Sequence, residues 1–360
     1  MAWLGQLAGL LQLAGGTLWH GHEMLFGFAT AALAGFLLTA VPNWTGTAPL
    51  RNGWLLLLCG AWAIGRTAMW MAALPASLVA VMDLVFLPLL AGFLAVPLLR
   101  SGNRRNLIFL AILAALFASN LAFHLEATSV VAGAAFRSLH VTLDLFALMI
   151  AIVGGRIVPA FTRNALRAGG STAVVSSRPF LDAVAVLTVA GVTVLDTIGF
   201  EGSLSAWLAV VAAGANALRM AGWSTAETLD KPILGVLHLG YAWLVIGLIA
   251  KSAAHWDLLA PATALHAWSI GAVGTMTMAV MSRAALGHTG RALRAPPLTV
   301  AAYLLVSAAT LVRLAVPPSA PEFLGPSIML SGALWTAAWL AFLVDYAPIL
   351  IRPRPDGQPG

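Results

Sequence analysis

The stretch from Trp19 to Gly46, WHGHEMLFGFATAALAGFLLTAVPNWTG, decides the fold class of this chain. From Met24 to Val41 it runs for eighteen residues without a charged side chain, which is the length that a helix needs to cross a bilayer. His20, His22 and Glu23 stand directly before this run. Ionisable groups at the end of a membrane helix cost free energy, and where they occur they usually bind a metal, a cofactor, a proton or a ligand. The stretch therefore predicts a membrane helix with functional groups at its start.

The composition of the whole chain agrees with a membrane protein. Hydrophobic residues make up 60% of the 360 positions, charged residues only 9%, and the mean hydropathy is +0.92, whereas soluble domains carry about 25% charged residues. The net charge of +6 does not indicate a nucleic-acid partner, because the basic residues stand in short segments between apolar runs. The single cysteine, Cys59, excludes a disulfide framework and a thiolate metal site.

Apolar runs long enough to cross a bilayer recur along the sequence, and no long soluble segment interrupts them. They predict an all-α membrane protein with about twelve transmembrane helices in a single domain, 1–360, of which the first span is short or marginal. The predicted spans are 2–18, 23–42, 53–73, 77–99, 107–124, 137–158, 180–199, 204–221, 233–251, 262–282, 298–316 and 326–350.

The distribution of basic residues predicts the orientation. When the connections are assigned alternately to the two sides, thirteen of the nineteen lysines and arginines fall on one side, while the other side holds only Arg137, Lys251 and Arg313. Cytoplasmic loops carry the excess of Lys and Arg in membrane proteins. Both termini are therefore expected in the cytoplasm.

Six of the eight histidines gather on the predicted outer side: His20, His22, His124, His140, His255 and His266. Haem iron and copper both accept neutral imidazole, and histidines that arrive from several helices at one depth can surround such a centre. His238 is expected nearer the cytoplasmic side, inside a span, and His288 in a cytoplasmic loop. We expect His124 and His255 to be solvated.

A regular helix does not allow His20 and His22 to bind one metal ion together. Positions i and i+2 of a regular helix point about 200° apart, so such a helix cannot aim both rings at one ion. We expect at least one of them to bind metal or haem, the alternative being an interfacial pair without a ligand. Glu23 either orients a ligand or stabilises the helix N-terminus.

Other ionisable residues inside the predicted spans can also be functional. His266 opens a run of small residues and methionines, and the buried ring of His238 needs a polar partner. His140 and Asp144 stand one turn apart, so the carboxylate can orient the ring, or the two can form a structural pair. Arg66 needs a partner such as Asp83 of the neighbouring span; we expect an ion pair there, the alternative being a haem-propionate contact.

Several runs of sequence resemble the NnrS family of polytopic bacterial membrane proteins. In chain order they are HGHEMLFGF (20–28), AGFLLTAVPNWTG (34–46), RRNLIF (104–109), GGRIVPAFTRN (154–164), LHLGYAW (237–243) and GTMTMAVMSRAALGHTGR (274–291) followed by LRAPP (293–297). The resemblance implies haem and copper as cofactors, a bacterial inner-membrane location, and a role in resistance to nitric oxide and nitrosative stress.

The residues and the resemblance together define the expected site. The expected cofactor-binding residues are His20, His22, His238 and His266, and the expected metal ligands are His20, His22, His140 and His266. Glu23, Asp144 and Arg66 are expected to support these ligands. These expected residues fit a protein that only binds nitric oxide, and they equally fit one that converts it.

Two further interpretations follow from the same residues. The pattern His20-x3-Met24-x-Phe26 also resembles the second helix of haem–copper oxidase catalytic subunits, which suggests a similar bundle. The paired histidines and the linked tyrosine of a true oxidase are missing, so oxygen reduction is not expected. The alternative function is a membrane transporter or proton-coupled channel that uses the intramembrane histidines and glutamate.

Overall fold

The computed structural model describes residues 2–7, 9, 16–102, 104–200 and 202–357, and the regular secondary structure within these ranges is helical. The chain divides into two compact units, Met1–Leu145 and Phe146–Gly360, and the boundary falls inside helix α8. A single membrane domain over 1–360 stays a prediction.

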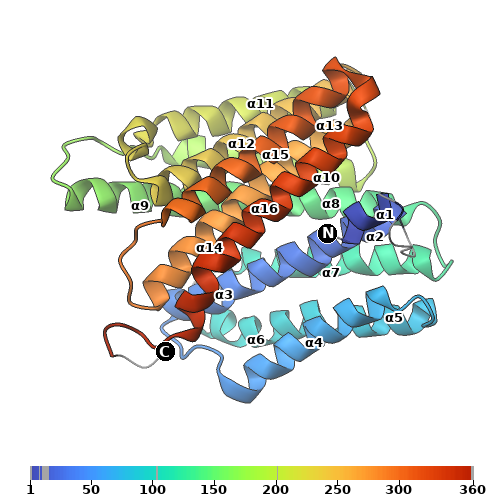
Figure 1. The fold of residues 1–360 in the computed structure, drawn as a ribbon, viewed down its shortest axis with the longest axis horizontal. Helices are drawn as coiled ribbons and strands as arrows, with labels where there is room; N and C mark the ends of the chain where they lie inside the picture. The colour runs from blue at the N-terminus through green and yellow to red at the C-terminus, as the bar shows by residue number, and fades with distance from the viewer. Residues whose placement is uncertain (1, 8, 10–15, 103, 201, 358–360) are drawn as a thin grey trace. The chain divides into compact units, whose positions relative to one another are not determined.

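The first unit is built around one long rod. Helix α2 (Gly16–His22), the π-helical segment η1 (Glu23–Ala29) and α3 (Thr30–Thr45) follow one another without a break. Gly46 then ends the rod in the left-handed region at φ 68°, and its N–H donates to the Pro42 carbonyl. Figure 1 shows α3 among the other helices of this unit, of which α6 packs against it. They are α1 (Ala2–Leu7), α4 (Asn52–Trp70), α5 (Ala76–Leu84), α6 (Phe86–Arg100), the short η2 (Arg104–Asn106), α7 (Ile108–Ala127) and α8 (Ala134–Met149).

The second unit is organised around helix α12 (Pro232–His255), which is buried along most of its length. It packs against α11, α13, α14 and the π-helical η5, and α15 and α16 lie side by side (Figure 1). The elements are η3 (Ile150–Gly154), α9 (Gly155–Ala168), α10 (Pro179–Thr197), α11 (Ser203–Ala221), η4 (Thr225–Thr228), α12, α13 (Pro261–His266), η5 (Ala267–Gly274), α14 (Thr275–His288), α15 (Pro297–Ser319), η6 (Pro321–Phe323) and α16 (Leu324–Ile351).

Ten helical segments among the described residues are long and apolar enough to cross a membrane. Each of them overlaps one of the predicted spans. Of the other two predictions, 53–73 forms helix α4, which is not among the ten, and 2–18 lies partly outside the described residues. The count of twelve, the cytoplasmic termini and the oxidase-like bundle stay predictions.

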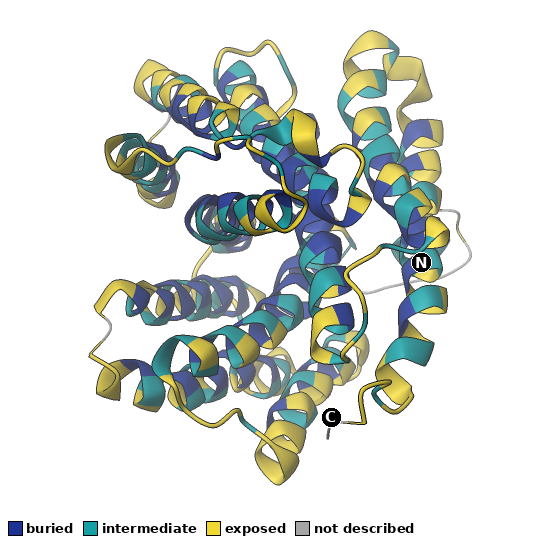
Figure 2. Ribbon diagram, turned by 90° about the vertical axis from the view of Figure 1, so that its left-hand side faces the viewer, coloured by how far each residue is buried: buried dark blue, intermediate teal, exposed yellow. Residues whose placement is uncertain are grey.

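The helices carry large apolar side chains on their outer faces. Val81, Phe180, Leu218 and Leu304 are each at least 60% exposed. Figure 2 shows the exposed residues as stripes along helices whose opposite sides are buried. Exposed apolar surface on this scale is unfavourable in water, and because these faces belong to helices suited to a bilayer, they fit contact with lipid.

Three of the spans contain a π-helical segment, and two of these place a carbonyl where a distant side chain can reach it. The indole N–H of Trp62 donates to the Gly27 carbonyl in η1, at 2.9 Å. In η3, the Arg219 guanidinium donates to the Ala151 carbonyl at 2.7 Å. Such π turns inside α-helices are frequent at functional sites, and η1 begins directly after His22.

Helices α4 and α5 approach each other at Gly65. A Cβ atom added to Gly65 would lie 3.0 Å from both the Cα and the Oδ1 atom of Asp83. We expect Gly65→Ala to push the two helices apart and to lower stability by about 1–3 kcal/mol, the usual cost of overpacking. Thermal unfolding of the purified protein in detergent measures this.

Gly60→Ala is the matched control, because it lies on the same helix and an added Cβ meets nothing within 4 Å. It should be neutral or stabilise by up to about 1 kcal/mol, since alanine is the better helix former. Equal unfolding temperatures for the two variants would contradict the close packing at Gly65.

Candidate metal centre

A buried polar cluster lies within the first unit, where four of its helical rods meet. Its members are His22 and Glu23 at the junction of α2 and η1, Arg66 on α4, Asp83 on α5, and Asn120 and His124 on α7. Local sequence explains part of the arrangement. Asn120 and His124 are four residues apart and therefore share one face of α7, while His22 and Glu23 follow each other where the helix changes from α to π.

The Asp83 carboxylate is the centre of this cluster. Its Oδ2 atom accepts hydrogen bonds from Asn120 Nδ2 and from His124 Nε2, both at 2.9 Å, and lies 3.2 Å from His22 Nε2. Its Oδ1 atom pairs with Arg66 Nη2. The side chain is only 1% exposed, so these contacts replace the water that would otherwise solvate the charge.

His22 has an oxygen acceptor at each ring nitrogen. Its Nδ1 lies 3.2 Å from Glu23 Oε1, while its Nε2 lies 3.0 Å from Asn120 Oδ1 and 3.2 Å from Asp83 Oδ2. A neutral imidazole carries only one N–H. One of the two ring nitrogens therefore faces an oxygen acceptor without a hydrogen atom between them. A second proton on the ring, or a metal ion bound at Nε2, would fill that position.

Arg66 joins the two carboxylates. One guanidinium nitrogen donates to Glu23 Oε1 and the other pairs with Asp83 Oδ1. The predicted Arg66–Asp83 ion pair is confirmed. The two carboxylates and one guanidinium give the cluster a formal charge of −1 when both imidazoles are neutral.

Three members of the cluster have the spacing of a metal site. One ligand atom each from His22, Asp83 and His124 lies within 4.8 Å of the others. Ligands at about 2.0–2.2 Å from an ion stand roughly 3 Å apart when they meet at a right angle, and the Asp83 Oδ2 atom lies 2.9 and 3.2 Å from the two imidazole nitrogens. Two imidazoles and one carboxylate suit copper, zinc or iron. The donor set thus fits a single metal ion.

The predicted site residues of the first unit fall in different surroundings. His22, Glu23 and Arg66 belong to the cluster. His20 stacks instead on the Trp3 ring, with 5.1 Å between the ring centres, and His140 donates from Nδ1 to the Phe136 carbonyl at 2.9 Å. Among the residues that the structure describes, the group able to hold a metal includes neither of them.

The sequence interpretation of His124 was wrong, and Asp83 and Asn120 were missing from the predicted site. His124 was expected in water because it ends a predicted span, yet it is 2% exposed. Its ring turns inward because Asp83 offers a buried acceptor. The spacing of Asn120 and His124 on one helix face was the available signal, together with the isolated acid of the 77–99 span.

His238 lies in the second unit and has hydrogen bonds at both ring nitrogens. Thr162 Oγ1 donates to the Val158 carbonyl, so it accepts from His238 Nε2 at 2.8 Å. The other nitrogen, Nδ1, then accepts from Thr225 Oγ1 at 2.9 Å. The ring is 1% exposed and would lose one of these hydrogen bonds if it bound iron. Its role as a cofactor ligand stays a prediction.

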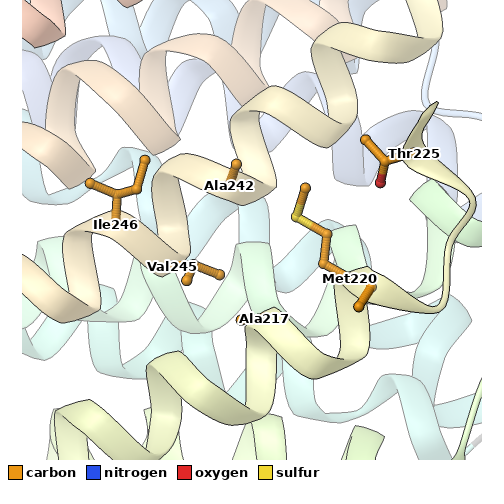
Figure 3. Close-up of a pocket in the computed structure, with 7 residues that line it drawn as sticks. Ala217, Met220, Thr225, Ala242, Val245 and Ile246 are labelled. Atoms are coloured by element: carbon orange, nitrogen blue, oxygen red, sulfur yellow. The ribbon is translucent and has the colours of Figure 1, made fainter. Parts of the chain in front are cut away.

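An apolar groove of about 330 Å³ lies between α11 and α12 in the second unit, and Figure 3 shows its lining side chains. It is bounded by α11, α12 and Thr225, and the Thr225 hydroxyl links it to the His238 imidazole. The lining residues are Ala217, Met220, Ala221, Thr225, Ala242, Val245 and Ile246.

His266, also in the second unit, ends α13 directly before η5. Its Nδ1 donates to the Ala262 carbonyl, so Nε2 accepts from Arg313 Nη2 at 3.4 Å. Asp144 of the first unit is buried. Ligand or supporting roles for His266, His140 and Asp144 stay predictions.

These observations define the class of protein: a helical, multi-pass membrane protein with a buried His–Asp–His cluster inside its first unit. A family model described as NnrS protein matches residues 1–354, nearly the whole chain. The chain therefore belongs to the NnrS family, as the sequence runs predicted. No curated protein and no solved structure matches it.

Asp83→Ala tests whether the carboxylate holds the cluster together. The change removes one of the two carboxylate partners of Arg66 and the oxygen that Asn120, His124 and His22 contact. Because the change breaks a buried ion pair and leaves buried donors without their acceptor, we expect the free energy of unfolding to fall by about 3–5 kcal/mol. Thermal unfolding in detergent gives the measurement.

Asp230→Ala provides the control, since Asp230 is 71% exposed and lies 3.6 Å from Lys231. An exposed ion pair contributes little to stability, so this variant should unfold at the same temperature as the unaltered protein. If Asp83→Ala behaved in the same way, the cluster would not be a structural centre.

Proposed function

We propose that this protein binds copper and haem in the bacterial inner membrane and contributes to tolerance of nitric oxide and nitrosative stress. The observation that carries the proposal is the buried group of His22, Asp83 and His124 in a member of the NnrS family. We assign the copper to this group.

The arrangement supports an ion and not a haem at this position. A porphyrin already fills four positions around its iron in one plane and leaves at most two axial positions. Three protein donors within 4.8 Å of one another suit an ion without a macrocycle. The candidate haem ligands are therefore the remaining predicted residues, His20, His238 and His266.

The protein groups around the proposed copper have separable tasks. His22 and His124 supply imidazole nitrogens, and Asp83 supplies a carboxylate oxygen. Asn120 donates to that carboxylate and thereby fixes its direction, which is how groups beyond the ligands usually orient a metal site. Burial of all four side chains excludes water from the ion.

The membrane setting suits the proposed target. Nitric oxide is small and uncharged, so it enters the apolar interior of a bilayer, and haem iron with an open position binds it. The charge distribution predicts that the ends of the spans carrying His22 and His124 face the periplasm.

Metal content tests the copper assignment. His22→Ala and His124→Ala should each lower copper affinity by about tenfold or more, because each removes a ligand and not merely an orienting group. His20→Ala and His140→Ala are the matched controls and should keep the copper of the unaltered protein. Metal analysis of the purified full chain decides between these two pairs. Loss of copper only in the control pair would overturn the assignment.

An absorption spectrum tests the haem. We expect the purified protein to be coloured, with a Soret band that shifts when nitric oxide is added. Of the variants His20→Ala, His238→Ala and His266→Ala, those that remove a haem ligand should lose or shift the band. A colourless protein with neither iron nor copper would favour the transporter, in which the buried cluster serves a proton or substrate.

A further inference from the structure

We propose that Arg66 selects the charge of the ion that the cluster binds, and that the site prefers a singly charged ion, Cu(I), over divalent ions. This inference rests on the proposed function, because it concerns the ion held by His22, Asp83 and His124. The ligand types alone do not dictate a preference for Cu(I), since imidazole and carboxylate also bind Zn(II) and Cu(II).

Three side chains set the fixed charge of the cluster. Glu23 and Asp83 contribute two negative charges, and Arg66 contacts both of them through separate nitrogens. An arginine stays protonated in proteins, so its charge is a permanent part of the site. With neutral imidazoles the cluster carries −1, which one singly charged ion neutralises.

A divalent ion would leave the same cluster with a charge of +1. The side chains of His22 and Asp83 are 0% and 1% exposed, and those of Arg66 and Glu23 only 13% and 15%. Water therefore reaches the cluster poorly, and an excess charge in such a place is unfavourable. The charge balance thus favours the monovalent ion.

The guanidinium is held in place and cannot easily withdraw. Its two carboxylate partners hold it, and the side chain packs closely on η1, where a Cβ atom on Gly27 would lie 3.2 Å from Arg66 Cδ and Nη1. One turn before Arg66, Trp62 donates to the Gly27 carbonyl and joins α4 to η1. Arg66 is therefore a fixed neighbour of the ion and not a mobile counter-ion.

Among monovalent ions, the ligand atoms favour Cu(I). Alkali ions prefer oxygen ligands, whereas copper accepts imidazole nitrogen readily. Ag(I), which carries the same charge and needs no reductant to stay monovalent, is a useful second probe and is used without ascorbate.

A competition experiment on the purified full chain tests the proposal. The protein in detergent is offered equal amounts of Cu(I), kept reduced with ascorbate under argon, and Zn(II), and the bound metals are measured. Ag(I) against Zn(II) repeats the test. The unaltered protein should take mainly the monovalent ion. In Arg66→Gln the cluster carries −2, so the ratio of bound monovalent to divalent ion should fall by about tenfold or more, because a full charge is removed within a buried site.

Two matched variants separate charge from packing. Arg66→Lys keeps the charge and should keep the preference of the unaltered protein. The double variant Glu23→Gln/Arg66→Gln returns the cluster to −1 without the guanidinium, and it should regain the monovalent preference. If Arg66→Gln does not fold, Glu23→Gln alone supplies the test: its neutral cluster should bind both ions more weakly and Zn(II) still less than Cu(I).

The outcomes distinguish this inference from the function on which it rests. Equal metal ratios in the unaltered protein and in Arg66→Gln would overturn the role of Arg66 while leaving the metal site intact. A loss of preference in Arg66→Lys equal to that in Arg66→Gln would also overturn it. Absence of any bound Cu(I), Ag(I) or Zn(II) in the unaltered protein would overturn the metal site itself.

Discussion

The buried carboxylate of Asp83 is the constraint on which the first unit depends. A charge inside a membrane helix is tolerated only where other groups compensate it, and here an arginine, an amide and two histidines from three other rods surround it. Helices α2, α4, α5 and α7 must meet at one depth for this to happen. The requirement that stabilises the fold also assembles the donor atoms of the proposed metal site.

Local backbone features make that meeting possible. The α helix changes to a π helix directly after His22, and the Gly27 carbonyl within the π segment accepts from Trp62. Glycines at positions 27 and 65 leave space for Arg66 and for the backbone of α5. Small residues at helix contacts are the usual way in which membrane helices approach closely. In this unit they bring charged side chains together as well as backbones.

The second unit has a polar interior of a different kind. Arg219 pairs with Asp182 and donates to Ala151, and the ring of His238 is hydrogen-bonded to two threonine hydroxyls. These groups satisfy one another without an added ion. In the first unit, by contrast, His22 faces oxygen acceptors on both sides and the cluster carries a formal negative charge. A second proton or a metal ion would therefore complete the first cluster, whereas neither is required around His238.

The sequence by itself determined the class and the family, and its predicted spans overlap all ten candidate membrane helices, because long apolar runs and family-specific runs are local features of the chain. It also identified His22, Glu23 and the Arg66–Asp83 pair, since ionisable residues in apolar segments need partners. Only the tertiary structure showed that His22, and not His20, enters the cluster and that His124 turns inward to Asp83. Which ring meets which carboxylate depends on how separate helices rotate and pack, and no local pattern in the sequence records that rotation.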